Sequence, residues 1–371
     1  MELLRKLFLG TGYRGDLQLD ELDGIRGLAV LYVLFSHLAN EGLVLFSVNI
    51  AGNASGKIGV YLFFTLSSFL LSRALLSESG RLTAADWLTY SMRRLTRIYP
   101  FYIVSLAFVV IASSCGWALF HPMSMSDFFS HLFLLDGKGH FWTIATEVKF
   151  YLILPLFIYA YRFVARRDYR IFIGGLLFVS LIAQIVSFMG LIEIRHSVLR
   201  YLPVFSMGTV IATLVHESSV QLRARVAGIA RYLSYLLMLM MVALMPNVLG
   251  GVTEALLDYR VEKLVPSSFF WGILCSAFVL SCVLSRDSLL RLFFRSTWMR
   301  VIGAMSFSLY INHWFVLMWV RDMQLSVCVK LLVFWVCSIL VSSLTFLVIE
   351  RPLSRLKLEK VSEGLIRRFR C

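Results

Sequence analysis

The sequence contains little charge for its length, and this scarcity limits the classes of protein to which it can belong. Only 16% of the 371 residues are charged and 59% are hydrophobic, with a mean hydropathy of +0.78. Soluble globular domains contain roughly 25% charged and about half apolar residues. We therefore exclude a water-soluble domain and expect a membrane to be the solvent for most of the chain.

Other features are missing as well. Polar and apolar residues do not alternate along the chain, which excludes a membrane β-barrel and leaves helices to satisfy the backbone in lipid. Residues 1–22 lack a long apolar core with a small-residue cleavage site, so we expect the chain to be inserted whole. The six cysteines have no CxxC spacing and predict neither a metal site nor a disulfide framework, although Cys115 and Cys328 could lie near an oxidising face.

The chain also lacks internal divisions. No linker, low-complexity run or repeat interrupts the apolar segments. We predict one integral membrane domain over residues 1–371, with a short cytoplasmic tail at 350–371. The missing repeat weakens the case for a transporter built from two inverted halves without excluding one.

What the sequence does contain is a series of apolar blocks. A helix needs about 20 residues to cross the hydrocarbon core of a membrane. We therefore predict an all-α polytopic membrane protein with about ten transmembrane helices. The first predicted span is the weakest, because Arg26 and His37 lie inside it. The predicted spans are residues 24–41, 57–76, 99–119, 142–161, 171–190, 198–215, 230–249, 265–285, 303–320 and 327–349.

The basic residues gather on one side of these spans. Of the 36 Lys and Arg residues, 26 fall in the segments on the side of the amino terminus, eight on the opposite side, and Arg26 and Lys149 inside spans. The positive-inside rule then predicts that both termini and the 77–98 loop are cytoplasmic and that the 120–141 loop is outside. This placement accounts for the formal charge of +14, and we do not expect nucleic acid as a partner.

Arg26 and His37 are candidate functional residues. They are 11 positions apart, close to three helical turns, so they share a helix face about 16 Å apart. An ionisable group inside a span costs about 3 kcal/mol or more unless it is paired or faces a cavity. The alternative is a snorkelling arginine and a polar histidine at a helix end.

A carboxylate lies at a similar depth in the fourth span. The segment HFWTIATEVKFYLILP places Trp142 and Glu147 near its outer end, with Glu147 at about the depth of His37. A carboxylate beside an imidazole orients it and raises its basicity, as a general base for a sugar hydroxyl requires. The alternative is an acid favoured by the helix dipole, with Trp142 as a belt residue.

Two further groups of polar residues stand out. Arg93 and Arg97 are i, i+4 neighbours at the cytoplasmic mouth of the third span and would suit a phosphate clamp, the alternative being positive-inside anchoring. In the ninth span, MSFSLYINHWF brings Tyr310 and His313 into the middle of the membrane. Ser306, Ser308 and His313 together indicate a wet cavity, the alternative being an interior histidine satisfied by its neighbours.

Taken in order, these segments resemble the acyltransferase-3 family of bacterial membrane proteins, which includes the O-antigen O-acetylases. LDGIRGLAVLYVLFSHL is similar to the first-helix motif of that family, whose arginine and histidine match Arg26 and His37. The other matching segments are GVYLFFTLSSFLLSR, RRLTRIYPFY with Arg93 and Arg97, FWTIATEVKFYLILP with Trp142 and Glu147, IGAMSFSLYINHWFVL with His313, and VIERPLSR with Glu350. Together the six segments extend over nearly the whole chain.

The chain departs from the family pattern at a few positions. Tyr61 stands where the family usually has an acid, Ser68 where it usually has glycine, and Val148 and Lys149 where Glu-Gln usually follows the matching glutamate. These departures concern the acid–base partners and the fit of the acceptor. Some members carry a fused esterase-like periplasmic domain, which we do not expect here.

The resemblance implies transfer of an acyl group, expected to be acetyl, from cytoplasmic acyl-CoA to a hydroxyl of an extracytoplasmic glycan such as lipopolysaccharide O-antigen or exopolysaccharide. It implies His37 as general base or transient acyl carrier, oriented by Glu147. Arg26 would stabilise charge along the path, and Arg93 and Arg97 would hold the phosphates of the donor.

Other partners and functions follow from the same residues. Acetyl-CoA would be a substrate and not a permanently bound cofactor, and the protein would lie among the lipids of the bacterial inner membrane as a multi-pass protein. The acceptor would be a glycan or a lipid-linked glycan. One alternative is a transporter or flippase of lipid-linked sugar, and another is a non-catalytic assembly or sensor subunit.

Overall fold

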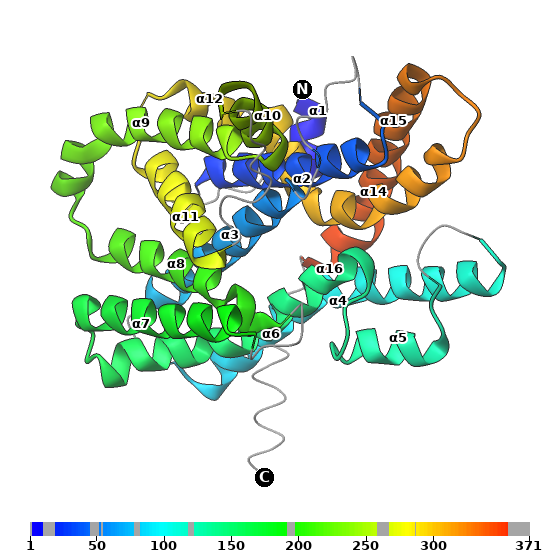
Figure 1. Cartoon of the computed structure of the whole chain (residues 1–371). Helices are drawn as coiled ribbons and strands as arrows, with labels where there is room; N and C mark the ends of the chain where they lie inside the picture. The colour runs from blue at the N-terminus through cyan, green and yellow to red at the C-terminus, as the bar shows by residue number, and fades with distance from the viewer. Residues whose placement is uncertain are drawn as a thin grey trace, which may run out of the picture.

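The computed structural model describes residues 2–9, 19–44, 52, 55–77, 82–117, 122–190, 197–257, 267–285 and 287–354. All regular structure within these residues is helical (Figure 1). Eight helices are long and apolar enough to cross a membrane, and the number rises to ten if each of two bent helix pairs forms one span. The predicted all-α polytopic fold is confirmed.

The described elements are helices and single helical turns. η1, η4 and η5 are π-helical turns and η3 is a 3₁₀ turn. The elements are α1 Glu2–Leu4, η1 Arg5–Leu9, α2 Asp20–Asn40, α3 Gly56–Ser77, α4 Ala84–Ser114, α5 Met125–Leu132, η3 Gly139–Phe141, α6 Trp142–Tyr159, η4 Ala160–Val164, α7 Tyr169–Phe188, α8 Val198–Glu217, α9 Val220–Ala243, α10 Pro246–Leu257, α11 Ser268–Leu284, α12 Leu289–Arg295, α13 Thr297–Ala304, α14 Ser306–Arg321, α15 Val327–Thr345, η5 Phe346–Glu350 and α16 Arg351–Ser354.

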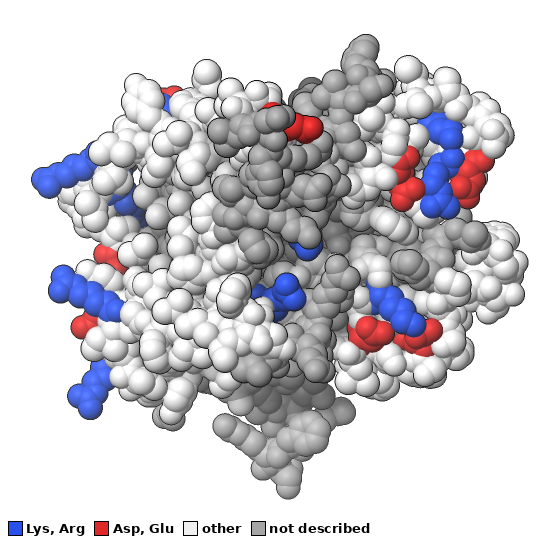
Figure 2. Space-filling model, viewed as in Figure 1, with Lys and Arg blue, Asp and Glu red and all other residues white. Residues whose placement is uncertain are grey.

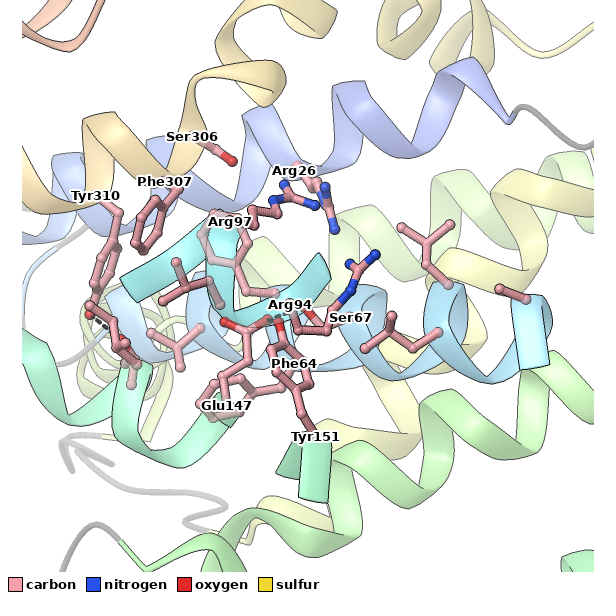
Figure 3. A pocket seen from close by; sticks show the side chains of 18 residues that line it. Arg26, Phe64, Ser67, Arg94, Arg97, Glu147, Tyr151, Ser306, Phe307 and Tyr310 are labelled. Carbon is pink, nitrogen blue, oxygen red and sulfur yellow. Dashed lines mark hydrogen bonds between the residues drawn. The ribbon is translucent and has the colours of Figure 1, made fainter. Parts of the chain in front are cut away.

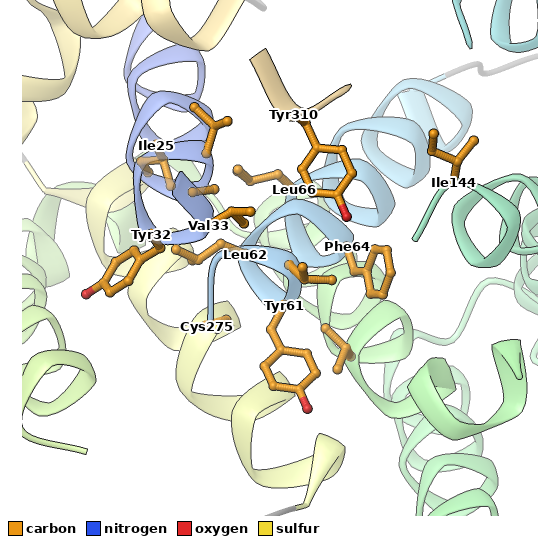
Figure 4. Packing of buried hydrophobic residues seen from close by; sticks show 14 of the residues in the cluster. Ile25, Tyr32, Val33, Tyr61, Leu62, Phe64, Leu66, Ile144, Cys275 and Tyr310 are labelled. Carbon is orange, nitrogen blue, oxygen red and sulfur yellow. The ribbon is translucent and has the colours of Figure 1, made fainter. Parts of the chain in front are cut away.

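The two most apolar helices are the least buried. α7 and α15, which have the highest hydropathy, are buried by only 17% and 22%, whereas α2, α3 and α8 are buried by between 67% and 78%. Polar groups inside a membrane protein turn toward its interior and leave the apolar helices in contact with lipid. Figure 4 shows α2 and α3 packed together through residues such as Val33 and Leu62.

On the face drawn in Figure 2, most of the coloured charged side chains lie toward the left and right edges, and a few basic ones lie nearer the middle. This distribution is expected of a protein whose middle is surrounded by lipid and whose ends meet water. Which end is cytoplasmic stays a prediction.

Several predicted boundaries are wrong. α4 begins at Ala84 instead of residue 99, with a capping box in which the Thr83 hydroxyl accepts from the Asp86 amide, so most of the predicted 77–98 loop is helix. α5 lies inside the predicted 120–141 loop, and α9 begins ten residues before the predicted 230. Hydropathy detects only the apolar part of a helix, and polar helical turns are mistaken for loops. The predictions at 78–81, 118–121 and 355–371 lie outside the described residues.

α2 is held closely by its neighbours. At Gly303 of α13, an added Cβ would lie 1.7 Å from the carbonyl oxygen of Asp23. A side chain does not fit between the two backbones there, so glycine is required. Nearby, α13 and α14 are bent by 72° relative to each other, which turns the first residues of α14 toward the centre of the molecule.

Candidate active site

A cavity of about 210 Å³ lies between α2, α3, α4, α6 and α14 (Figure 3). Its apolar walls come largely from α3, with Phe63 and Phe64 among them. The polar and charged side chains that line it are Arg26, Ser67, Arg94, Arg97, Thr143, Glu147, Tyr151, Ser306 and Tyr310. Five helices, from α2 near the amino terminus to α14, thus bring their polar residues to one place.

Glu147 supplies the carboxylate of the cavity. Its Oε1 accepts a hydrogen bond from the Tyr151 hydroxyl, one turn later on α6, at 2.6 Å, and another from the Ser67 hydroxyl of α3. Figure 3 shows the carboxylate directed toward Ser67 and the arginines. Two hydroxyl donors on different helices therefore fix its position.

Three arginines lie around this carboxylate, with Arg26 on α2 and Arg94 and Arg97 on α4 (Figure 3). Among the residues that the structure describes, none accepts a hydrogen bond from their guanidinium groups or forms an ion pair with them within 4.0 Å. They interact electrostatically with one another and with Glu147. Three cations face one lining carboxylate, so the cavity is suited to an anion that would supply the missing partners.

The predicted pairing of Arg93 with Arg97 is not the arrangement in the structure. Arg93 is exposed on α4 and is not one of the residues that line the cavity, whereas Arg94 is. Residues three and four positions apart both share a helix face, so the sequence allowed either partner for Arg97. The rotation of α4 about its axis decides between them.

The predicted contact between Glu147 and His37 does not form. In the described part of the chain the hydrogen bond of the His37 ring goes to His313, whose Nε2 lies 3.3 Å from His37 Nδ1. Glu147 is bonded instead to the two hydroxyls described above. The two residues were matched by depth in the membrane, but depth does not determine the side of the helix on which a residue lies.

Tyr310 connects the cavity to the histidines. It lines the cavity, and its ring centroid lies 5.8 Å from that of His313. Its hydroxyl donates to the His140 carbonyl oxygen at 2.8 Å and accepts from the Thr143 hydroxyl at 2.9 Å. The predicted cavity residues Tyr310 and His313 are therefore neighbours, with Tyr310 on the cavity wall and His313 behind it.

Trp142 has a different place. Its ring is stacked on that of Tyr201 with 5.0 Å between centroids, and it is not among the residues that line the described cavity. Packing explains its position without a contact to substrate.

Ser67, Arg94 and Tyr151 line the cavity but were not among the predicted site residues. The spacing of Tyr151 from Glu147, one helical turn, is the signal that could have identified it. Glu350 also lies close to the site, since it is buried at 3% exposure, accepts a hydrogen bond from the Ser308 hydroxyl at 3.0 Å and interacts electrostatically with the cavity arginines. The π-helical turn η5 that ends at Glu350 is not evident in the sequence.

The departures from the family pattern lie beside the cavity. The Ser68 hydroxyl donates to the Thr65 carbonyl oxygen, and the side chain packs where Gly208 of α8 leaves room for it. The Tyr61 ring is buried, with its centroid 6.2 Å from those of Tyr201 and Trp271. Both substitutions are accommodated by packing.

The described residues contain no group of three His, Cys, Asp or Glu side chains that could hold a metal ion.

A helical membrane protein with three guanidinium groups around a cavity has a site that is suited to an anion. The sequence profile described as acyltransferase domain matches residues 19–350. The chain therefore belongs to this family, the acyltransferase-3 family.

Curated relatives match part of the chain. The peptidoglycan O-acetyltransferase OatA of Listeria monocytogenes is 27% identical over an alignment of 204 residues, which covers 49% of this chain and 29% of the relative. The O-acetyltransferase OatA of Staphylococcus aureus is 30% identical over 37% of this chain and 24% of its own length. The putative peptidoglycan O-acetyltransferase YrhL of Bacillus subtilis is 31% identical over 37% of this chain and 23% of its length.

The matched regions span less than a third of the length of these relatives. No solved structure matches the chain.

Proposed function

We propose that this protein is an O-acetyltransferase that moves an acetyl group from acyl-CoA, bound from the cytoplasm, to a hydroxyl of a glycan on the other side of the bacterial inner membrane. The single observation that carries the proposal is the set of three cavity arginines whose guanidinium groups have neither a hydrogen-bond acceptor nor an ion pair within 4.0 Å among the described residues. Family membership supports the chemistry of acyl transfer.

The arginines are the part of the site that suits the donor. Coenzyme A is a polyanion with phosphate groups, and a guanidinium group binds phosphate through two parallel hydrogen bonds. Arg94 and Arg97 lie one turn apart on α4 and would hold phosphate oxygens, while Arg26 on α2 would face the same anion from the opposite wall. The thioester would then extend along the cavity toward Tyr310.

The histidines are the part that suits the acceptor. His37 is partly exposed and lies near the carboxyl end of α2, which ends at Asn40. A neutral imidazole takes a proton from a hydroxyl near physiological pH, as a general base in acyl transfer must. We assign the proton transfer to His37 and the binding of the donor to the arginines.

The acceptor is an extracytoplasmic glycan. The relatives from Listeria monocytogenes and Bacillus subtilis carry peptidoglycan in their names, which supports peptidoglycan. Lipopolysaccharide O-antigen and exopolysaccharide have the same chemistry, a sugar hydroxyl that becomes an acetate ester. The test therefore measures all three fractions.

The test compares a strain that lacks the gene with the same strain carrying it on a plasmid. Mild alkali releases ester-linked acetate from purified peptidoglycan, lipopolysaccharide and exopolysaccharide, and the released acetate is quantified. We expect one fraction to lose acetate in the deletion strain and to regain it on complementation. A transporter of lipid-linked sugar would instead change the amount of glycan and leave the acetate per repeat unchanged.

Two further measurements test the membrane assignment. The Lys138→Cys variant should react with a membrane-impermeant thiol reagent from outside the cell, since the 120–141 loop is assigned to that side. Proteoliposomes given radiolabelled acetyl-CoA on the cytoplasmic side of the protein should transfer label to an enclosed disaccharide of the peptidoglycan type. Labelling of position 138 only from the cytoplasmic side would reverse the assignment.

A further inference from the structure

The hydrogen bonds around His37 and His313 fix which ring nitrogens carry protons. His313 Nδ1 lies 3.1 Å from the carbonyl oxygen of Leu309, one turn earlier on α14. A carbonyl oxygen can only accept, so this nitrogen carries a hydrogen and donates it. In a neutral imidazole the other nitrogen is then an acceptor, so His313 Nε2 holds a lone pair.

The same reasoning continues to His37. His313 Nε2 lies 3.3 Å from His37 Nδ1, and because the first nitrogen is an acceptor, the second has to donate. His37 therefore holds its proton on Nδ1, and its Nε2 is left with the lone pair. One backbone carbonyl oxygen thereby sets the tautomer of both rings, and we call Leu309, His313 and His37 the histidine relay.

The two histidines differ in access. His313 is fully buried at 0% exposure, enclosed by rings that include Tyr310 and Trp314, whereas His37 is partly exposed. A sugar hydroxyl can approach His37 and cannot approach His313. Only His37 can exchange a proton with the acceptor, which leaves His313 a different part in the reaction.

We propose that His313 is a positioning residue that holds His37 in the tautomer whose Nε2 is the base for the acceptor hydroxyl. The inference rests on the function proposed above and adds a residue to it. It replaces the carboxylate that we expected from the sequence, because the acceptor bonded to His37 Nδ1 is an imidazole and not Glu147. His313 has the part that the aspartate has in a serine–histidine–aspartate triad, where it orients the catalytic histidine.

The reaction step is balanced in these terms. The acceptor oxygen attacks the thioester carbonyl carbon, and its hydroxyl proton passes to His37 Nε2. The new C–O bond forms, the C–S bond breaks, and the proton then passes from His37 to the departing thiolate to give the free thiol of coenzyme A. While His37 is an imidazolium, its Nδ1–H bond to His313 is charge-assisted and therefore stronger.

The test uses a matched pair of variants at position 313. Glutamine and methionine are unbranched and similar in length, but only the glutamine side chain places an amide oxygen where it can accept from His37 Nδ1. We expect His313→Met to lower kcat by about tenfold or more, within the range that general-base terms contribute, without changing KM for acetyl-CoA. His313→Gln should recover a large part of the loss.

The measurement is acetyl transfer from acetyl-CoA to a peptidoglycan-type disaccharide by the full-length protein in proteoliposomes. Binding of acetyl-CoA to each variant shows that the fold and the donor site are intact. His313→Asn, whose shorter amide cannot reach His37, should behave like the methionine variant. His140→Gln is the control, because that ring lies 5.8 Å from the ring of His313 but is not part of the relay, and it should keep most of the turnover.

The outcomes separate the two proposals. Wild-type protein that transfers acetyl groups while His313→Met turns over equally fast would overturn the relay and leave the proposed function intact. A glutamine variant as slow as the methionine variant would also overturn it, because the lost hydrogen bond would not be the cause. Wild-type protein that binds acetyl-CoA but transfers nothing to any glycan fraction would reject the function and the relay together.

Discussion

The arginine cavity and the histidine relay are neighbours with opposite electrostatic character. In the cavity, three guanidinium groups face one lining carboxylate and, within the described residues, have no hydrogen-bond acceptor of their own. In the relay, both ring nitrogens of His313 and Nδ1 of His37 have hydrogen-bond partners, and within the described residues only His37 Nε2 lacks one. In the part of the chain that the structure describes, the guanidinium groups of the cavity therefore lack acceptors, and the relay has one free lone pair, on His37 Nε2.

This difference indicates a division of labour. A site with unsatisfied buried cations gains free energy when an anion enters, so the proposal gives it the binding of the donor. A neutral hydrogen-bonded pair gains little from binding but can hold a proton for a short time, so the proposal gives it the proton transfer. Tyr310 lies at the boundary and touches both. Variants of the cavity and of the relay should therefore change binding and turnover separately.

The largest effect is expected from His37→Ala. The variant removes the base and should lower acetyl transfer by about 10²- to 10⁴-fold, the range of general-base catalysis, while acetyl-CoA still binds. Transfer is measured as glycan acetate at equal membrane levels of protein. If His37→Ala keeps its activity while His313→Ala loses it, the base is on α14 and the two regions have been assigned incorrectly.

The second effect belongs to the cavity. Replacing Arg94 and Arg97 together by lysine keeps both charges but removes bidentate binding of phosphate, and we expect acetyl-CoA affinity to fall by about tenfold or more, because charge-assisted hydrogen bonds contribute about 1.5–3 kcal/mol each. Affinity is measured by equilibrium binding to purified protein. Arg93→Lys is the matched control, since Arg93 is exposed outside the cavity, and it should bind as tightly as wild type.

Glu147→Gln should produce a smaller effect of opposite sign on binding. Removing the carboxylate leaves three cations without their lining counter-charge, so coenzyme A should bind several-fold more tightly while part of the transfer activity remains. A control is Ser67→Ala, which deletes one hydrogen bond to the carboxylate without changing charge. Weaker binding of coenzyme A to Glu147→Gln would show that the carboxylate contacts the donor directly.

The smallest effect concerns Asp127, which lies on α5 outside both regions. The hydrogen bond from the Lys138 ammonium, together with those from Ser124, lowers the pKa of this carboxyl below its ordinary value. A lowered folded-state pKa stabilises the protein fully above the unfolded-state pKa of about 4, and this stabilisation is lost as the pH falls from there through the folded-state pKa.

Asp127→Asn should therefore lower the unfolding temperature slightly at neutral pH, because exposed ion pairs contribute little. The difference from wild type should disappear in acid, and tryptophan fluorescence on heating measures it. An equal difference at acid and neutral pH would mean that the helix cap and not the charge is responsible.

The sequence predicted the helical architecture, and four of the predicted site residues, Arg26, Arg97, Glu147 and Tyr310, line the cavity. Spacing along one helix was enough to place Arg26 and His37 on a common face, because helical geometry is regular. It was not enough to choose between Arg93 and Arg94, or to find the partner of Glu147, because these depend on how neighbouring helices are rotated. Glu350 was matched by resemblance, and its inward position depends on a π-helical turn that local sequence does not specify.

The close approach of Gly303 to Asp23 has a consequence for movement. α2 carries Arg26 from the donor cavity and His37 from the relay, and it is pressed against α13 at a point where not even a methyl group fits. A rocking motion of α2 past α13, of the kind that carriers use, is obstructed there. α2 instead keeps Arg26 and His37 at a fixed separation, about 16 Å over 11 residues. In the proposed reaction, the acetyl group would cross the membrane while bound to coenzyme A, and α2 would stay in place without opening a path through the protein.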